Sequence, residues 1–125
     1  MLCLVGGVYH LTMADYFDYE GQPISHERWI ELFRGDRVVG RTRLDKSHFR
    51  GGVPLEVSTV WLGMVFVSED PPKIFETMVF LAQPDSWDDL GCWRWATWDE
   101  ALAGHREICR GIEDGTLELH DPDLY

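Results

Sequence analysis

The feature that most constrains the fold is a stretch, residues 57–105, in which two strand patterns are followed by a capped helix pattern. Residues 55–62 and 74–81 are rich in β-branched and aromatic side chains, and an Asp-Pro-Pro turn signal lies between them. Thr97 and Glu100 then form a capping box, in which the hydroxyl accepts from a helical amide and the carboxylate reaches back. These patterns predict an antiparallel hairpin and a helix that packs on it, which is typical of an α+β fold.

Weaker patterns complete the predicted order of elements. Ser25 occupies a helix N-cap position, and an apolar stripe at helical spacing follows it until Gly35. The expected elements are a strand at 16–19, a helix at 26–34, strands at 38–45, 55–62, 74–81 and 92–96, and a helix at 97–113. We therefore expect α+β order β-α-β-β-β-β-α, with an antiparallel sheet of about four to five strands and both helices on one face. The other sheet face would be open to water or to a partner.

The chain has 125 residues, which is enough for one packed core and too few for two. We expect a single α+β domain over residues 13–115 and a loose acidic tail over residues 116–125. Residues 1–12 are apolar and precede an ordinary polar start at Met13, so they are either an upstream extension or a short edge strand. The three cysteines show no paired spacing, and no apolar run approaches the ~18 residues of a membrane span. These features favour a cytoplasmic protein without membrane contact.

The charge of the chain is strongly asymmetric. The formal net charge is −11, but residues 1–54 contain seven acidic and seven basic residues and are neutral overall. Residues 55–125 contain fifteen acidic and four basic residues and carry the whole excess. Because affinity for phosphates comes mostly from Lys and Arg, this balance disfavours direct binding of nucleic acid.

Some residue sets could in principle support chemistry. His105 and Cys109 are four residues apart on one helical face and Cys92 precedes that helix, so these three residues are candidate zinc ligands. Only Cys3, or the distant His48 or His120, could complete the four ligands of such a site, and cysteines of this kind usually pack as small core residues. P-loop and G-x-S-x-G motifs are absent, and nothing orders Ser58, Thr59 or Cys109 with His105 for nucleophilic catalysis. We expect no enzyme activity, no metal and no cofactor.

Residues for partner binding are a more specific expectation. Glu76 is a carboxylate within an apolar strand, and we expect it on the open sheet face, paired with Arg41 or Arg43. Trp93 and Trp95 share one side of a strand, where they are either core residues or an outward aromatic patch beside the acidic loop 82–91. The candidate partner-binding residues are Arg41, Arg43, Glu76, Asp85, Trp87, Asp88, Asp89, Trp93 and Trp95.

Three blocks of the chain, in this order, resemble a family of small uncharacterised proteins of actinobacterial bacteriophages and prophages. The blocks are residues 57–63 (VSTVWLG), 74–80 (IFETMVF) and 96–105 (ATW through AGH). The resemblance covers roughly residues 15–110 and includes the segment before Trp29, and family members typically start near Met13. It implies an accessory phage protein that acts in the host cytoplasm, and it assigns no catalytic residue.

These observations predict a phage accessory protein that acts without catalysis, by binding a host or phage protein or by assembling with itself. The acidity of residues 55–125 leaves a second hypothesis, an acidic DNA mimic that inhibits a host DNA-binding protein. A structural role in the virion is a third.

Overall fold

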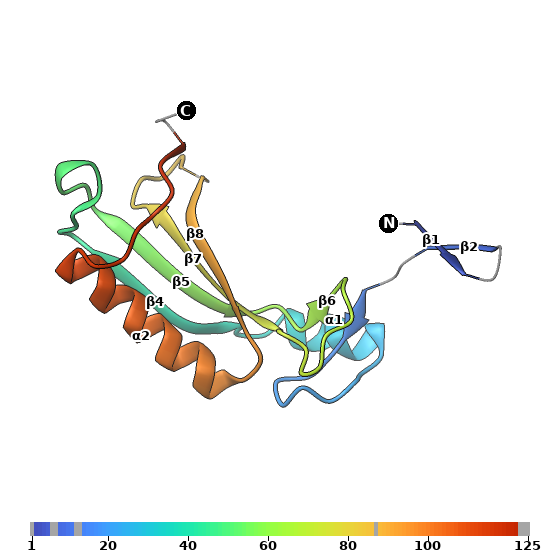
Figure 1. The fold of residues 1–125 in the computed structure, drawn as a ribbon. Coiled ribbons are helices and arrows are strands. Elements are labelled where there is room, and N and C mark those ends of the chain that lie inside the picture. The colour runs from blue at the N-terminus through green and yellow to red at the C-terminus, as the bar shows by residue number, and fades with distance from the viewer. Residues whose placement is uncertain (1, 6–7, 12–13, 87, 123–125) are drawn as a thin grey trace.

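The centre of the structure is an antiparallel sheet whose strands follow one another in the same order as in the chain (Figure 1). The computed structural model describes residues 2–5, 8–11, 14–86 and 88–122. The strands of the sheet are β4 (Val38–Leu44), β5 (Leu55–Trp61), β7 (Phe75–Leu81) and β8 (Asp89–Trp95). The predicted hairpin is confirmed, because β5 pairs antiparallel with β7 along its whole length.

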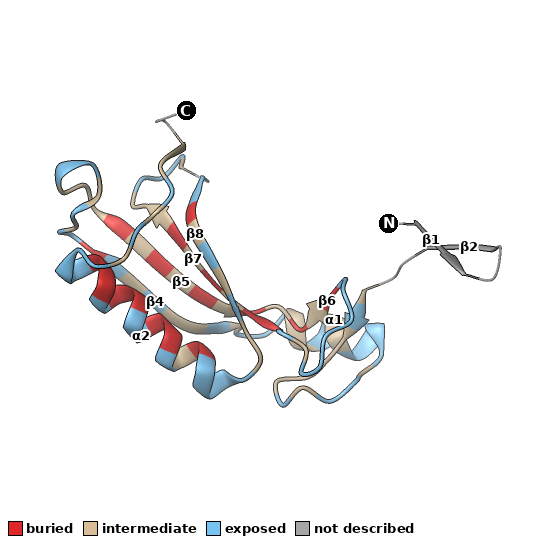
Figure 2. Ribbon diagram, viewed as in Figure 1, coloured by how far each residue is buried: buried red, intermediate tan, exposed pale blue. Residues whose placement is uncertain are grey.

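Helix α2 (Trp98–Asp114) covers one face of this sheet (Figure 2). In β5 every second residue from Leu55 to Trp61 is buried, and in β7 every second residue from Phe75 to Val79. This is the period of two that a strand shows when one of its faces is packed. The buried residues of the helix are Ala101, Gly104, His105, Ile108, Cys109, Gly111 and Ile112. Each large aliphatic side chain fully buried here contributes roughly 1.5–3 kcal/mol.

The predicted helix caps are confirmed. The Thr97 hydroxyl accepts from the backbone N–H of Glu100 at 3.1 Å, and the Glu100 carboxylate accepts from the backbone N–H of Ala96 at 3.2 Å. Ser25 accepts from the N–H of Arg28 at 3.1 Å at the start of α1 (His26–Phe33). These side chains satisfy amides that a helix leaves without an internal partner.

A second, smaller cluster lies beyond one end of the sheet (Figure 1). It contains α1 and a short strand pair, β3 (Asp15–Tyr16) with β6 (Met64–Val65). The Trp29 indole packs here and donates to the carbonyl of Leu62 at 2.9 Å. The α+β prediction and its element order are confirmed. Helix α1, however, lies at the end of the sheet rather than beside α2.

The remaining elements are short. Strands β1 (Leu2–Val5) and β2 (Val8–Leu11) pair with each other, and a 3₁₀ helix, η1 (Phe49–Gly51), lies between β4 and β5. The nature of residues 1–12 stays a prediction. No helix in the described ranges is both long and apolar enough to cross a membrane.

The expectation of a loose C-terminal tail is wrong for the residues described after α2. Leu117 and Leu119 pack against the core, and the backbone N–H of His120 donates to the carbonyl of Leu90 at 2.8 Å. The Arg50 guanidinium pairs with the Asp121 carboxylate at 2.5 Å. Apolar side chains at every second position of an otherwise acidic segment explain this docking.

A β-bulge corrects one detail of the predicted first strand of the sheet. The pairing of β4 with β5 shifts between Val38 and Gly40, so an extra residue is inserted there. Val39 therefore packs against the second cluster, while Val38 is 42% exposed. Without the bulge, the alternation that buries Leu44 would place Val38 on the buried side as well.

Two glycines let the helix lie close to the sheet. A Cβ added at Gly104 of α2 would come within 2.3 Å of the Trp95 ring, and one at Gly40 of β4 within 3.1 Å of the His105 ring. The absent side chains make room for the two rings, so the helix–sheet distance depends on these positions.

We predict that Gly104→Ala destabilises the fold, although alanine favours a helix over glycine by ~1 kcal/mol. The added methyl group meets the Trp95 ring, and overpacking of this kind costs about 1–3 kcal/mol. Thermal unfolding followed by circular dichroism should show a lower Tm.

The matched control is Ala103→Gly at the neighbouring exposed position, where only helix propensity changes. It should cost about 1 kcal/mol. A higher Tm for Gly104→Ala would contradict the close packing of Trp95 on α2.

Candidate functional site

The sheet face turned away from α2 carries three of the six charged residues predicted for partner binding, Arg41, Arg43 and Glu76. We call it the open sheet face. Its side chains are Arg41 and Arg43 from β4, Glu56, Ser58 and Val60 from β5, Glu76, Met78 and Phe80 from β7, and Cys92 and Arg94 from β8. No helix of the described chain lies over this face in Figure 1, so it is the broad accessible surface of the sheet.

Arginine and carboxylate groups on this face are matched. Arg41 pairs with Glu56 at 2.9 Å across β4 and β5, and Arg94 pairs with Glu76 at 2.9 Å across β8 and β7. Arg43 pairs at 2.8 Å with Asp45, the residue that follows β4. Exposed pairs such as Arg43 with Asp45 contribute little stability, typically about 0–1 kcal/mol. Their effect is that the face is nearly neutral on a chain of net charge −11.

The predicted partner of Glu76 is wrong, although its position on the open sheet face is as expected. Register places Glu76 directly opposite Arg94, whereas β5 separates it from Arg41 and Arg43. Directly opposed side chains are the ones that meet across strands. The Glu76 side chain is only 15% exposed, because Arg94 lies against it.

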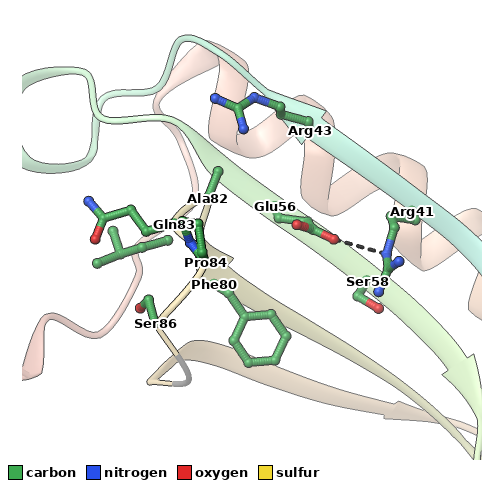
Figure 3. A pocket seen from close by; sticks show the side chains of 10 residues that line it. Arg41, Arg43, Glu56, Ser58, Phe80, Ala82, Gln83, Pro84 and Ser86 are labelled. Carbon is green, nitrogen blue, oxygen red and sulfur yellow. Dashed lines mark ion pairs between the residues drawn. The ribbon is translucent and has the colours of Figure 1, made fainter.

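A shallow pocket of 340 Å³ lies at one corner of the open sheet face (Figure 3). Arg41, Arg43 and Ser58 line it from β4 and β5. Residues that follow β7, Gln83 and Ser86 among them, line the other side. The arginine-bearing strands and the loop after β7 therefore meet at this corner. Guanidinium, amide and hydroxyl groups beside the Phe80 ring suit a mixed polar and apolar protein contact.

The acidic loop is shorter than predicted, because β8 already begins at Asp89. Asp85 and Asp88 are exposed in the connection, and Asp89 is exposed at the start of the strand. Trp87 lies outside the described residues. The acidic residues thus border the open sheet face without lying in its centre.

Trp93 and Trp95 do not form an outward patch on the open sheet face. They are opposite Thr77 and Phe75 in the register, and those residues are buried toward α2. The Trp95 indole N–H donates to the Thr77 hydroxyl at 2.9 Å. Both indoles are only half-buried, because β8 is the edge strand of the sheet. Both indoles therefore point to the helix side of the sheet, as the core interpretation predicted.

Sequence reasoning missed several residues of the open sheet face, including Ser58, Met78 and Phe80. They are the alternate residues of the two central strands, so the period of two contained the signal.

His105 is the centre of a buried hydrogen-bonded network. Its Nδ1 lies 2.7 Å from the Thr59 hydroxyl, and its Nε2 lies 2.8 Å from the Thr42 hydroxyl. Thr59 is in turn 2.6 Å from the Thr77 hydroxyl. The network therefore connects α2 to β4, β5 and β7, and the Trp95 indole extends it to β8.

One assignment of protons gives every donor in this network an acceptor. Trp95 donates to Thr77, Thr77 to Thr59, and Thr59 to Nδ1 of a neutral imidazole. The N–H at Nε2 of His105 then donates a hydrogen bond to the Thr42 hydroxyl oxygen, and the Thr42 hydroxyl in turn donates to the Cys109 sulfur. Burial, and secondly the nearby Arg106 charge, lower the pKa of His105, which favours this neutral form.

The same geometry bears on the nucleophile and metal hypotheses. Thr59 is fully buried, so no substrate reaches its hydroxyl, and Ser58 points to the opposite face of the sheet from His105. Cys92 is also on that opposite face, and therefore does not converge with His105 and Cys109. Within the described ranges no cluster of three metal-binding side chains occurs.

Cys92 is exposed on the open sheet face, next to Glu76. Burial of part of the thiol, followed by the charge of Glu76 and a hydrogen bond to it, raises the pKa of Cys92 to about 11. A thiol with this pKa is almost wholly protonated at neutral pH, so it is a poor nucleophile.

No family model, curated protein or solved structure matches this chain. The structure contains a nearly neutral sheet face with paired charges, and a polar network in which Thr59 and Thr77 are fully buried while Thr42, His105 and Cys109 line a pocket of 410 Å³ beside α2.

We predict that the wild type has a higher free energy of unfolding than His105→Gln, and that this difference becomes smaller as the pH falls. Since the folded pKa of His105 is lowered, the unfolded chain binds a proton more readily below its ordinary pKa of about 6.5. The wild type therefore loses stability between about pH 6.5 and the lower folded pKa, whereas the glutamine variant has no such group. Chemical denaturation at pH 7.5 and pH 5 measures the free energy of unfolding of both proteins. An unchanged difference between them would contradict the conclusion that His105 is buried in its neutral form.

We also predict that Glu76→Gln lowers the pKa of Cys92 from about 11, because it removes a negative charge beside the thiol. Part of the shift should remain, since burial is its largest cause. Alkylation rates of the Cys92 peptide between about pH 7 and 11, measured by mass spectrometry, report this pKa. Glu56→Gln is the matched control and should change nothing; equal effects of both variants would refute the Glu76 contact.

Proposed function

We propose that this chain is a non-enzymatic protein that binds another protein through the open sheet face. The observation that carries the proposal is the neutral charge of this face on a chain of net charge −11. A protein surface can approach such a patch without the repulsion that the rest of the molecule exerts. Interfaces between proteins are also typically mixed, with apolar side chains among matched polar groups.

The composition of the face supports this kind of partner over others. Its two central strands contribute Val60, Met78 and Phe80, which offer apolar contact area, while Arg41 and Arg94 are held by carboxylates. Nucleic acid needs unpaired cationic groups to replace its counterions, and this face has its arginines neutralised. A partner that contributes apolar side chains and polar groups at the rim fits it best.

The resemblance to actinobacterial phage proteins suggests where such a partner would be met. A phage accessory protein acts in the host cytoplasm, so its partner would be a host protein, another phage protein or a second copy of the chain. The DNA-mimic hypothesis needs rows of free carboxylates. Glu56 and Glu76 do not supply them on the open sheet face, because arginines neutralise both.

We expect a photo-crosslinking amino acid at position 80 to form a discrete protein adduct in a lysate of the host. The side chain at this position lies on the open sheet face, within the shallow pocket. The same amino acid at position 113, exposed on α2, is the control. An adduct at both positions or at neither would contradict the proposal.

Ser58→Arg should weaken the association by at least ~tenfold, because it puts an extra charge in the centre of the interface. Glu113→Arg adds the same side chain away from the face and should have no effect. Circular dichroism checks that both variants fold. Loss of the adduct on adding excess duplex DNA would instead support a DNA mimic.

A further inference from the structure

A groove runs along the edge of the sheet between β8 and α2, and its volume is 650 Å³. It lies on the helix side of β8 and is therefore separate from the open sheet face. Trp93 and Trp95 line it with their half-buried indoles, and Gly104, Ile108 and Leu117 complete its apolar surface. We call it the β8–α2 groove.

The strand that borders this groove is open to pairing. In the part of the chain that the structure describes, β8 is the last strand of its sheet. An edge strand presents a row of backbone donors and acceptors to an incoming extended chain. The C-terminal segment already uses this edge at one point, where the His120 N–H donates to the Leu90 carbonyl at 2.8 Å.

The length of the groove matches a short extended segment. Its helical wall runs from Glu100 to Gly111, which is about 16 Å at the ~1.5 Å rise of a helix. An extended strand covers that distance with about five residues at ~3.3 Å each. A segment added beside β8 would direct every second side chain toward Trp93 and Trp95.

The charged side chains at the rim of the groove favour a bound segment with basic ends. Glu100 and Glu107 line its rim together with Arg110, and the Arg110 guanidinium is already shared between Glu107 and Asp114. The rim is therefore net negative, on a molecule of charge −11. Lysine or arginine side chains at the ends of the segment would meet these carboxylates, while acidic ends would be repelled.

We infer that the β8–α2 groove binds an extended segment of a basic partner protein by addition of a strand to β8. Aliphatic side chains of the segment contact the indoles of Trp93 and Trp95, and basic side chains at its ends lie beside Glu100 and Glu107. This binding site is independent of the open sheet face, so either proposal can fail while the other stands.

The test uses the full chain and a blocked heptapeptide, KTVTLTK, whose alternate residues place Val and Leu in the groove with Lys on either side. Calorimetry and tryptophan fluorescence should show saturable binding. The acidic counterpart ETVTLTE should bind at least ~tenfold more weakly, because its ends face the carboxylates of the rim. Absence of saturable binding, or equal binding of both peptides, would overturn the inference.

Two variants and a matched control locate the binding. Trp93→Ala should weaken binding of KTVTLTK at least ~tenfold, and Ala103→Lys, at an exposed helical position lining the groove, about fivefold. Trp98→Ala removes a partly exposed indole that does not line the groove and should change the affinity less than about twofold. An equal loss in Trp93→Ala and Trp98→Ala would overturn the site. A dimer in sedimentation that Ala103→Lys dissociates would show that a second copy occupies the groove instead.

Discussion

The hydrogen-bonded network around His105 is the interaction on which the rest of the structure depends. Buried polar groups must find partners, and here one imidazole, one indole and three threonine hydroxyls satisfy one another beneath α2. This holds only when β4, β5, β7 and β8 keep one register and the helix presents His105 above them. A slip of one residue in any strand would turn its threonine or indole to the other face. The network therefore specifies one arrangement, where apolar packing alone would tolerate several.

The same register determines what the outer surface contains. Side chains alternate along a strand, so the residues that satisfy the network fix which residues point away from it. Glu76 meets Arg94 because Thr77 and Trp93 are turned inward beside them. A surface built in this way is rigid, because its backbone is held by the sheet and by α2 behind it. Rigid surfaces lose little conformational freedom on binding, which favours their use in recognition.

Much of this fold could be predicted from the sequence, since its signals are local. The capping box at Thr97 and the two-residue period of residues 55–62 and 74–81 depend only on near neighbours. What could not be predicted depends on register. The partner of Glu76, the bulge that turns Val38 outward and the direction of Trp93 all follow from which residues lie opposite one another. Composition alone also could not show that alternate leucines dock the acidic C-terminal segment.

The strands lie in the sheet in the order in which they occur in the chain, so the distribution of charge along the sequence also affects its distribution in the molecule. The half of the chain before residue 55 is neutral and contains the β4 edge, while the half that carries the excess acid contains the β8 edge. Helix α2 belongs to the acidic half and carries five acidic and two basic residues, and it packs on β4 as well as on β8, so the two faces of the sheet differ in charge more than its two edges. An asymmetry of this kind turns the protein during diffusion, so that encounters with a charged partner are oriented before any contact forms.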